Sequence, residues 1–196
     1  MKKTLLLIGT LLLTASGVYA YSMPRWGLTA IDVYIPEHEY SSVVRSAFEE
    51  WSAATGNRVR FRFQSTRFAS NNAPIRVQFP EETASYYVVE SKRIETMGYF
   101  TNMDDGFINK ANIKVYSQTK KNGRTNQQQV KSQMLREVGY ILGLEKKYGK
   151  CEGEERSIMC MNEKTRSNTI TDQDRQAIVQ KYDRSNEDIK NRKNKN

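Results

Sequence analysis

The sequence has 196 residues, with 31 Lys or Arg against 22 Asp or Glu, which gives a net charge of +9. This length suits one domain. His38 is the only histidine, so no site within one chain can hold two imidazoles, and two cysteines exclude a Cys₄ zinc site and a disulfide-dense scaffold. The positive charge admits acidic partners but does not determine the fold.

The first twenty residues are typical of a secretory signal peptide. Lys2 and Lys3 precede the apolar run LLLIGTLLL at residues 5–13, and small residues follow as far as Ala20. This run is far shorter than the roughly 20 apolar residues that cross a bilayer. We therefore expect cleavage after Ala20 rather than a membrane anchor, and a protein that is secreted or periplasmic. Removal of the segment leaves 176 residues and a charge of +7.

Export places the two cysteines in an oxidising compartment. We therefore expect a disulfide between Cys151 and Cys160, with two free buried thiols as the alternative. The mature chain keeps only four leucines, so its core must rely on aromatic and β-branched residues. Such residues favour a fold that contains a sheet.

The first part of the mature chain predicts three strands and one helix. Residues 31–35, 58–63 and 74–79 alternate apolar with polar side chains, which is typical of strands. Between the first two, Ser41 or Ser42 is a candidate N-cap for a helix that ends near Gly56. The buried face of this helix is expected to consist of Val43, Val44, Ala47, Phe48 and Trp51.

The second part predicts a loop, two short strands and two helices. We expect the loop at 81–93, strands at 96–101 and 112–117 joined through a turn at 104–106, and a helix at 126–142. This helix should bury Val130, Met134, Val138, Ile141 and Leu142. A final helix begins at Thr171, with Asp174 as a capping partner, and has an apolar side made of Ile178, Val179 and Tyr182. Residues 184–196 carry little to bury, so we expect a disordered basic tail.

A local motif lies at the end of the long predicted helix. Residues 136–145 read REVGYILGLE, and the metzincin zinc motif is H-E-x-x-H-x-x-G-x-x-H followed by a Met-turn. In this frame Arg136 and Tyr140 stand at the first two histidine positions, Glu137 at the general base and Gly143 at the glycine. The third histidine position falls on Lys146, with Glu145 just before it. Met159, in the segment Ser-Ile-Met, resembles the Met-turn methionine.

The chain resembles the matrixin branch of the metzincins over most of residues 24–183. The similar segments are Trp26-Gly27, the 31–35 strand, the Trp51 helix, the hairpin from Gly98 to residue 115, and Thr171 to Asp174. The resemblance implies an α+β fold with a twisted five-stranded mixed sheet and three helices. It divides the chain into a signal peptide (1–20), a matrixin-like domain (21–183) and a tail (184–196). Members of this family are usually secreted zinc endopeptidases.

The residues at the motif positions predict that the zinc chemistry is lost. Two side chains at i and i+4 share a helix face and can hold one Zn²⁺, while the glutamate activates the water on the metal. Arg136 and Lys146 have no acceptor atom, and Tyr140 could bind only as a phenolate. Glu145 could act as a ligand. We therefore interpret the chain as a pseudoprotease with no cofactor and with Glu137 idle, which binds a protein or peptide in the former substrate cleft along the strand at 96–101.

Three alternatives remain open. The first is an active metallopeptidase that draws ligands from Glu145, Tyr140 and Glu137, with His38 as a further candidate, although an early-loop histidine is more often a solvated surface residue. The second is a polyanion-binding secreted module built on Arg58, Arg60 and Arg62 of the basic strand and on the basic tail. Nucleic acid is not the expected partner, because strict alternation favours a solvated strand face. The third is an ordinary amphipathic helix that happens to end at Gly143.

One pairing is predicted within the motif. We expect the Arg136 guanidinium to pair with Glu137 or Glu145 and so replace the missing metal charge, with the Tyr140 hydroxyl as a possible donor to the same acid. The partner and the oligomeric state do not follow from the sequence.

Overall fold

The computed structural model describes residues 25–80, 94–101, 107–115, 118–119, 123–124, 126–149, 151–153, 156–162 and 164–193. The predicted signal peptide at 1–20, the predicted loop at 81–93 and the predicted turn at 104–106 lie outside the described residues. None of the described helices is both long and apolar enough to cross a membrane.

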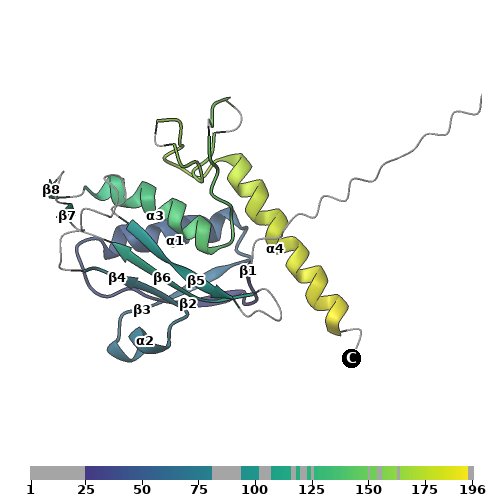
Figure 1. Cartoon of the computed structure of the whole chain (residues 1–196). Coiled ribbons are helices and arrows are strands. Elements are labelled where there is room, and N and C mark those ends of the chain that lie inside the picture. Colours follow the sequence, from purple (N-terminus) through teal and green to yellow (C-terminus); the bar gives the residue numbers. More distant parts are fainter. Residues whose placement is uncertain are drawn as a thin grey trace, which may run out of the picture.

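The described strands form one main sheet (Figure 1). Its main path has the spatial order β1-β6-β4-β2-β3, and every neighbouring pair on this path is parallel. The strands are β1 Arg25–Trp26, β2 Ala30–Tyr34, β3 Arg60–Gln64, β4 Ile75–Gln78 and β6 Phe107–Val115. β5 (Ile94–Thr101) pairs with β6 in the antiparallel direction, and a separate hairpin joins β7 (Gln118–Thr119) to β8 (Gly123–Arg124).

The expected α+β architecture of a metzincin is confirmed, with one correction to the sheet. We predicted a five-stranded mixed sheet, whereas the five strands of the main path are all parallel and the antiparallel direction enters only through β5. We did not predict β1, because a strand of two residues is too short to show an alternation of apolar and polar side chains. The β7–β8 hairpin was missed for the same reason.

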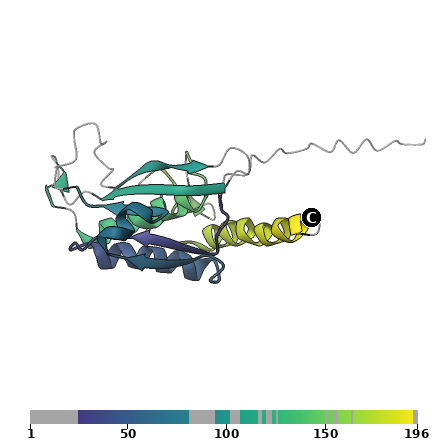
Figure 2. The same ribbon diagram turned by 90° about the horizontal axis from the view of Figure 1, so that it is seen from below.

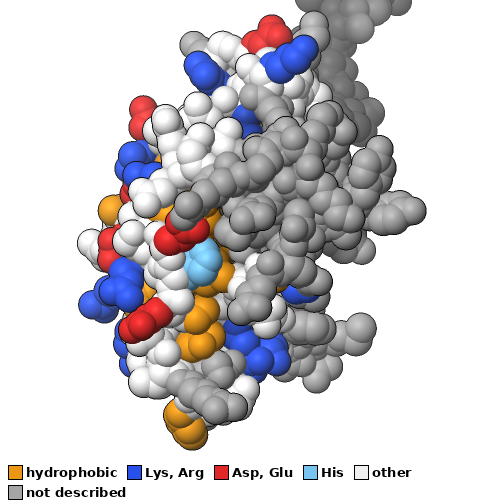
Figure 3. Space-filling model, turned by 90° about the vertical axis from the view of Figure 1, so that its left-hand side faces the viewer, with side chains coloured by type: hydrophobic (Ala, Val, Ile, Leu, Met, Phe, Trp, Pro, Cys, Tyr) orange, Lys and Arg blue, Asp and Glu red, His pale blue; other side chains and the backbone are white. Residues whose placement is uncertain are grey.

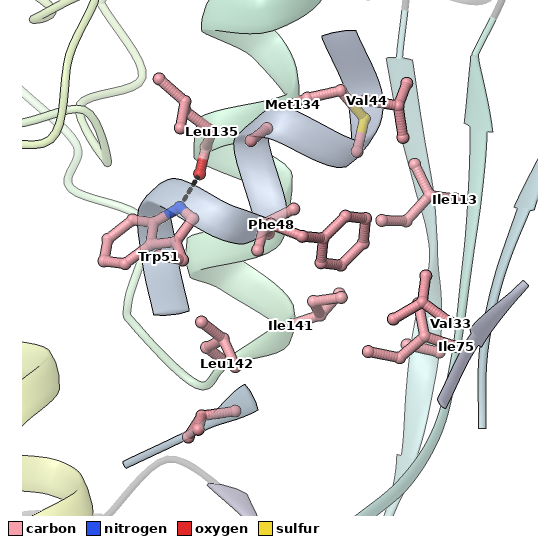
Figure 4. Close-up of a cluster of buried hydrophobic side chains, with 14 of the residues drawn as sticks. Val33, Val44, Phe48, Trp51, Ile75, Ile113, Met134, Leu135, Ile141 and Leu142 are labelled. Carbon is pink, nitrogen blue, oxygen red and sulfur yellow. Dashed lines mark hydrogen bonds between the residues drawn. The ribbon is translucent and has the colours of Figure 1, made fainter. Parts of the chain in front are cut away.

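The helices α1 (Ser41–Ala54) and α3 (Gln127–Ile141) pack against each other on one face of the sheet, and the short helix α2 (Arg67–Asn72) lies at the opposite side (Figure 1). Both long helices bury the stripes that their sequences predict, apart from Val43, which is half-buried. In Figure 4, Phe48 from α1 and Ile141 from α3 lie between the helices and Val33 and Ile113 of the sheet, while Trp51 lies beside Leu135. The Trp51 indole donates a hydrogen bond to the Leu135 carbonyl at 2.6 Å.

The predicted serine cap of α1 is wrong. The N-cap residue is Tyr40, which makes no side-chain capping bond, and the Ser41 hydroxyl instead donates to the Pro36 carbonyl at 2.7 Å. The buried ring of Tyr40 fixes the start of the helix through packing rather than through capping. The helix α2 was also missed, since six residues are too few to show a helical period.

Helix α4 (Asp172–Lys193) continues beyond the predicted apolar side and projects past the sheet in both views (Figures 1 and 2). We expected disorder from residue 184, but the backbone is helical as far as Lys193. Extending an existing helix costs far less than starting one, so a polar sequence can continue a helix whose first half is already packed. Ile178 and Tyr182 provide that packing.

The predicted disulfide is confirmed. Cys151 and Cys160 are bonded, with their Cα atoms 6.2 Å apart. The bond ties the segment after α3 to the turn that contains Met159, where the Lys147 amide donates to the Met159 carbonyl at 3.0 Å. Two kinds of cross-link therefore hold the Met159 turn against the end of the long helix.

Asp174 anchors this turn to α4. Its carboxylate is 2% exposed and accepts four hydrogen bonds: from the Ser157 hydroxyl (2.5 Å), the Ile158 amide (3.0 Å), the Thr171 amide (2.9 Å) and the Thr171 hydroxyl (2.7 Å). The Thr171 bonds confirm the predicted cap. The bonds to Ser157 and Ile158 add a link across the fold that no local motif predicts.

Replacing Asp174 with alanine should lower the free energy of unfolding by more than about 3 kcal/mol, because it leaves several buried donors without an acceptor. Asp172→Ala is the matched control: this acid lies in the first turn of the same helix but its side chain is 97% exposed. Its loss should cost less than about 1 kcal/mol. Urea unfolding of both variants measures the difference, and equal effects would contradict an anchoring role for Asp174.

Candidate functional site

Helix α3 presents the motif residues and ends at the predicted glycine. The Asn126 side chain caps the helix by accepting from the Gln129 amide at 2.8 Å. Gly143 has φ +92°, a left-handed conformation that a side chain disfavours. The Leu144 amide then donates back to the Gly139 carbonyl at 3.0 Å. The chain thus reverses directly after the helix and returns beside the turn that contains Met159.

Arg136 and Glu137 form a buried ion pair. The Arg136 Nε and Nη2 atoms donate to Glu137 Oε1 at 3.0 and 2.9 Å, and each residue is only 3% exposed. A guanidinium keeps its charge at any ordinary pH, so in this enclosed position it requires a compensating anion. Of the two acids that the sequence offered as partners, the structure pairs Arg136 with Glu137.

Tyr140 and Lys146 form the second contact among the motif residues. The Lys146 Nζ lies 4.0 Å from the centre of the Tyr140 ring, in the geometry of a cation–π interaction. Both residues are half-buried. The turn at Gly143 is what brings Lys146 back over the last turn of α3. The two side chains that stand at the second and third histidine positions are therefore in contact with each other.

Glu145 is exposed, and its carboxylate interacts electrostatically with Lys181 of α4 rather than pairing with Arg136. The pKa of Lys181 on α4 is lowered to about 8, chiefly by burial and also by the charge of Arg25, while the negative charge of Glu145 acts in the opposite direction and raises it. Glu145 is therefore close enough to Lys181 to stabilise its ammonium. The proposal that Glu145 compensates Arg136 is not supported by this arrangement.

Met159 packs directly under α3. A Cβ atom added to Gly139 would lie 2.7 Å from the Met159 sulfur and 2.7 Å from Trp51 Cζ2, closer than real side chains approach. Gly139 thus allows the helix, the tryptophan of α1 and the methionine turn to meet at one point. We did not predict this role of Gly139, although a glycine in a helix interior is a signal of close packing.

His38 is not a free surface residue as we expected. Its ring stacks on Phe79, with the ring centres 4.1 Å apart and the planes within 9°, and its Nδ1 accepts from the Tyr40 amide at 3.3 Å. Figure 3 shows the histidine among hydrophobic side chains, with acidic groups on either side. Its contacts belong to the loop between β2 and α1 and to the residue after β4, and they are those of a packing residue.

Three ring donors fix the C-terminal half of α3 from outside. The indole N–H of Trp26 donates to the Ile141 carbonyl at 2.8 Å, and the Tyr182 hydroxyl donates to the Leu142 carbonyl at 3.1 Å. The Trp51 indole serves the Leu135 carbonyl in the same way. Burial raises the pKa of Tyr182, so its hydroxyl remains a donor at any physiological pH. These roles are not visible in a sequence pattern, because each joins residues more than thirty positions apart.

The residues at the motif positions do not fit a zinc ion. The set consists of a guanidinium, an ammonium, a tyrosine ring held against that ammonium and a carboxylate already bonded to the guanidinium. A dication there would face two fixed positive charges and would find none of the neutral imidazole donors that zinc prefers. Within the described residues no three His, Cys, Asp or Glu side chains gather closely enough to hold a metal.

Three comparisons relate the chain to known proteins. Among solved structures the chain is similar to that of myroilysin, with a TM-score of 0.49 and 14% identity over 82% of this chain and 95% of the other. No curated protein matches the sequence. The family model of the matrixins matches residues 23–183, which span every element from β1 into α4. The chain belongs to the matrixin family.

Proposed function

We propose that this matrixin is an exported, non-catalytic member of its family that binds a protein or peptide segment where catalytic members hold their substrates. The observation that carries the proposal is the hydrogen-bonded ion pair of Arg136 and Glu137. A general base must be free to take a proton from a metal-bound water. Here the carboxylate is engaged in neutralising a buried guanidinium, in a site that is 3% exposed.

The contact of Lys146 with Tyr140 supports the same proposal. The phenol would have to lose its proton to bind a metal, and the Lys146 ammonium lies 4.0 Å from the ring centre, so a metal ion there would meet a second positive charge nearby. A working enzyme with unusual ligands would need at least three suitable donors in one place. His38 stacks on Phe79, and Glu145 acts on Lys181, so neither is gathered with Glu137 by the contacts described.

Binding requires a surface but no metal. Strand β5 lies beside α3 and pairs only with β6 among the described strands. An extended peptide can add to such a sheet edge through main-chain hydrogen bonds alone, with side-chain pockets providing the selectivity. The expectation from the matrixin resemblance, that substrate lies along this strand, supports the choice of β5 for the proposed site. A member of the family can therefore bind a peptide without being able to hydrolyse it.

Export is supported by two observations. Residues 1–20 have the order of a basic start, a short apolar run and a small residue at the expected cleavage position. The disulfide between Cys151 and Cys160 is of a kind that persists in oxidising compartments.

Stability measurements test the ion pair itself. Arg136→Met should cost about 3 to 5 kcal/mol, because it leaves the Glu137 carboxylate buried without its cation. The double variant Arg136→Met with Glu137→Leu should recover most of that loss, since two apolar side chains of similar size need no compensation. Denaturant unfolding of the single, double and wild-type proteins measures the coupling. An Arg136→Met variant with an unchanged free energy of unfolding would show that the two side chains do not depend on each other.

A substrate assay tests the function. The mature protein, supplied with zinc and an unfolded protein substrate, should leave the substrate intact, and Glu137→Gln should behave identically. Added extended peptides should slow hydrogen exchange at amides of β5 in the same preparation. Cleavage that is blocked by a chelator and lost in Glu137→Gln would instead make the protein an active metallopeptidase. If no peptide changed the hydrogen exchange of the β5 amides, the proposed peptide binding along β5 would be wrong.

A further inference from the structure

Strand β3 forms the other end of the sheet, and no described strand pairs with its outer edge, which we call the free edge. Its five residues, Arg60–Gln64, pair with β2, and β3 is the last strand of the path among the described residues. This edge is separate from β5 and from the motif residues of α3. It is also more exposed than an interior strand, since Arg60, Arg62 and Gln64 are exposed and Phe61 and Phe63 are only half-buried.

The pairing of β3 with β2 shows which backbone groups face outward. The Arg60 amide donates to the Thr29 carbonyl at 2.9 Å, and the Gln64 carbonyl accepts from the Ile35 amide at 2.9 Å. In a parallel pair the residues of one strand point their N–H and C=O groups alternately to one neighbour and to the other. The N–H and C=O groups of Phe61 and Phe63 therefore point to the free edge, where an added strand could bond to them.

The charges along this edge are all positive on β3 itself. Arg62 is bonded to Asp32 through two contacts of 2.7 and 3.0 Å, so its charge is largely compensated. Arg60 forms no ion pair with any described residue. On the opposite side of the strand Arg45 of α1 lies over the Phe63 ring, 5.0 Å from its centre. Within the described part of the chain, neither Arg60 nor Arg45 has an acid partner, so one such guanidinium lies on each face of the sheet at this edge.

This distribution discriminates between possible partners. A second copy of β3 paired to the same edge would bring arginine beside arginine, which is unfavourable. Charged side chains on an edge are a known protection against self-association. The same charges favour a strand that carries carboxylates on both of its faces. The rings of Phe61 and Phe63 meet Phe48 edge-on and hold the strand in place, so the edge is preformed.

We propose that the free edge of β3 is a second binding site, which accepts an extended acidic peptide by strand addition. The peptide would bond to the outward N–H and C=O groups of Phe61 and Phe63. Its carboxylates would meet Arg60 on one face of the sheet and Arg45 on the other. The site does not depend on the proposed binding along β5.

The test uses the mature protein and a short peptide in which pairs of glutamates alternate with pairs of threonines, so that an extended strand carries carboxylates on both faces. The peptide should bind more weakly as salt rises, and it should slow hydrogen exchange at the Phe61 and Phe63 amides. The Arg60 amide should change little, because it is already bonded to Thr29. Arg60→Glu should weaken binding at least tenfold. Arg156→Glu makes the same charge change at an exposed position after α3 and should leave the affinity unchanged.

Three outcomes would overturn the proposal. The first is equal binding of a lysine–threonine peptide, or no binding of either peptide. The second is that the peptide binds without protecting the Phe61 and Phe63 amides and that heparin binds equally well. This result would indicate a surface that attracts polyanions without strand addition. The third is protection of both amides in the protein alone that increases with protein concentration, which would assign the edge to self-association.

Discussion

The buried guanidinium of Arg136 is the constraint on which the centre of this molecule depends. An arginine that is 3% exposed must be compensated, and Glu137, the next residue on the same helix, provides the compensation. The two residues therefore limit each other. The glutamate cannot be free while the arginine is buried, and the arginine cannot remain buried if the glutamate is lost. We propose that this mutual dependence has replaced the dependence of catalytic matrixins on their metal.

The scaffold around the pair is held by contacts between side chains and backbone groups of the chain itself. Indole and phenol groups from β1, α1 and α4 bond to carbonyls of α3 or just beyond it, so three separate elements position that helix. Asp174 and the disulfide hold the Met159 turn against it from the other side. Gly139 permits the turn and Trp51 to approach closely. Such contacts are compatible with the proposed loss of the metal.

The sequence predicts those parts of the fold that depend on residues close together in the chain. The stripe of apolar residues along α3, the glycine at its end and the Thr171–Asp174 cap each lie within a few turns of chain, and each is confirmed. The serine cap of α1 failed because packing of the Tyr40 ring, a long-range effect, decides where that helix begins. The expectation of disorder from residue 184 failed for a related reason. Composition alone does not reveal that α4, which continues to Lys193, is already nucleated by its packed first half. At the site, the pairing of Arg136 with an acid could be predicted from charge, whereas the place of Lys146 over Tyr140 depends on how the chain returns after Gly143.

The most direct measurement of the central claim is the zinc content of the mature protein after equilibration with excess zinc and removal of the free metal. A variant with Arg136→His, Tyr140→His and Lys146→His restores the complete ligand motif on the same scaffold and serves as the positive control. We predict that the wild-type protein retains no stoichiometric zinc and that a chelator leaves its melting temperature unchanged, while the triple variant binds one ion per chain. One tightly bound zinc ion per wild-type chain, with a melting temperature that falls when a chelator is added, would contradict the account.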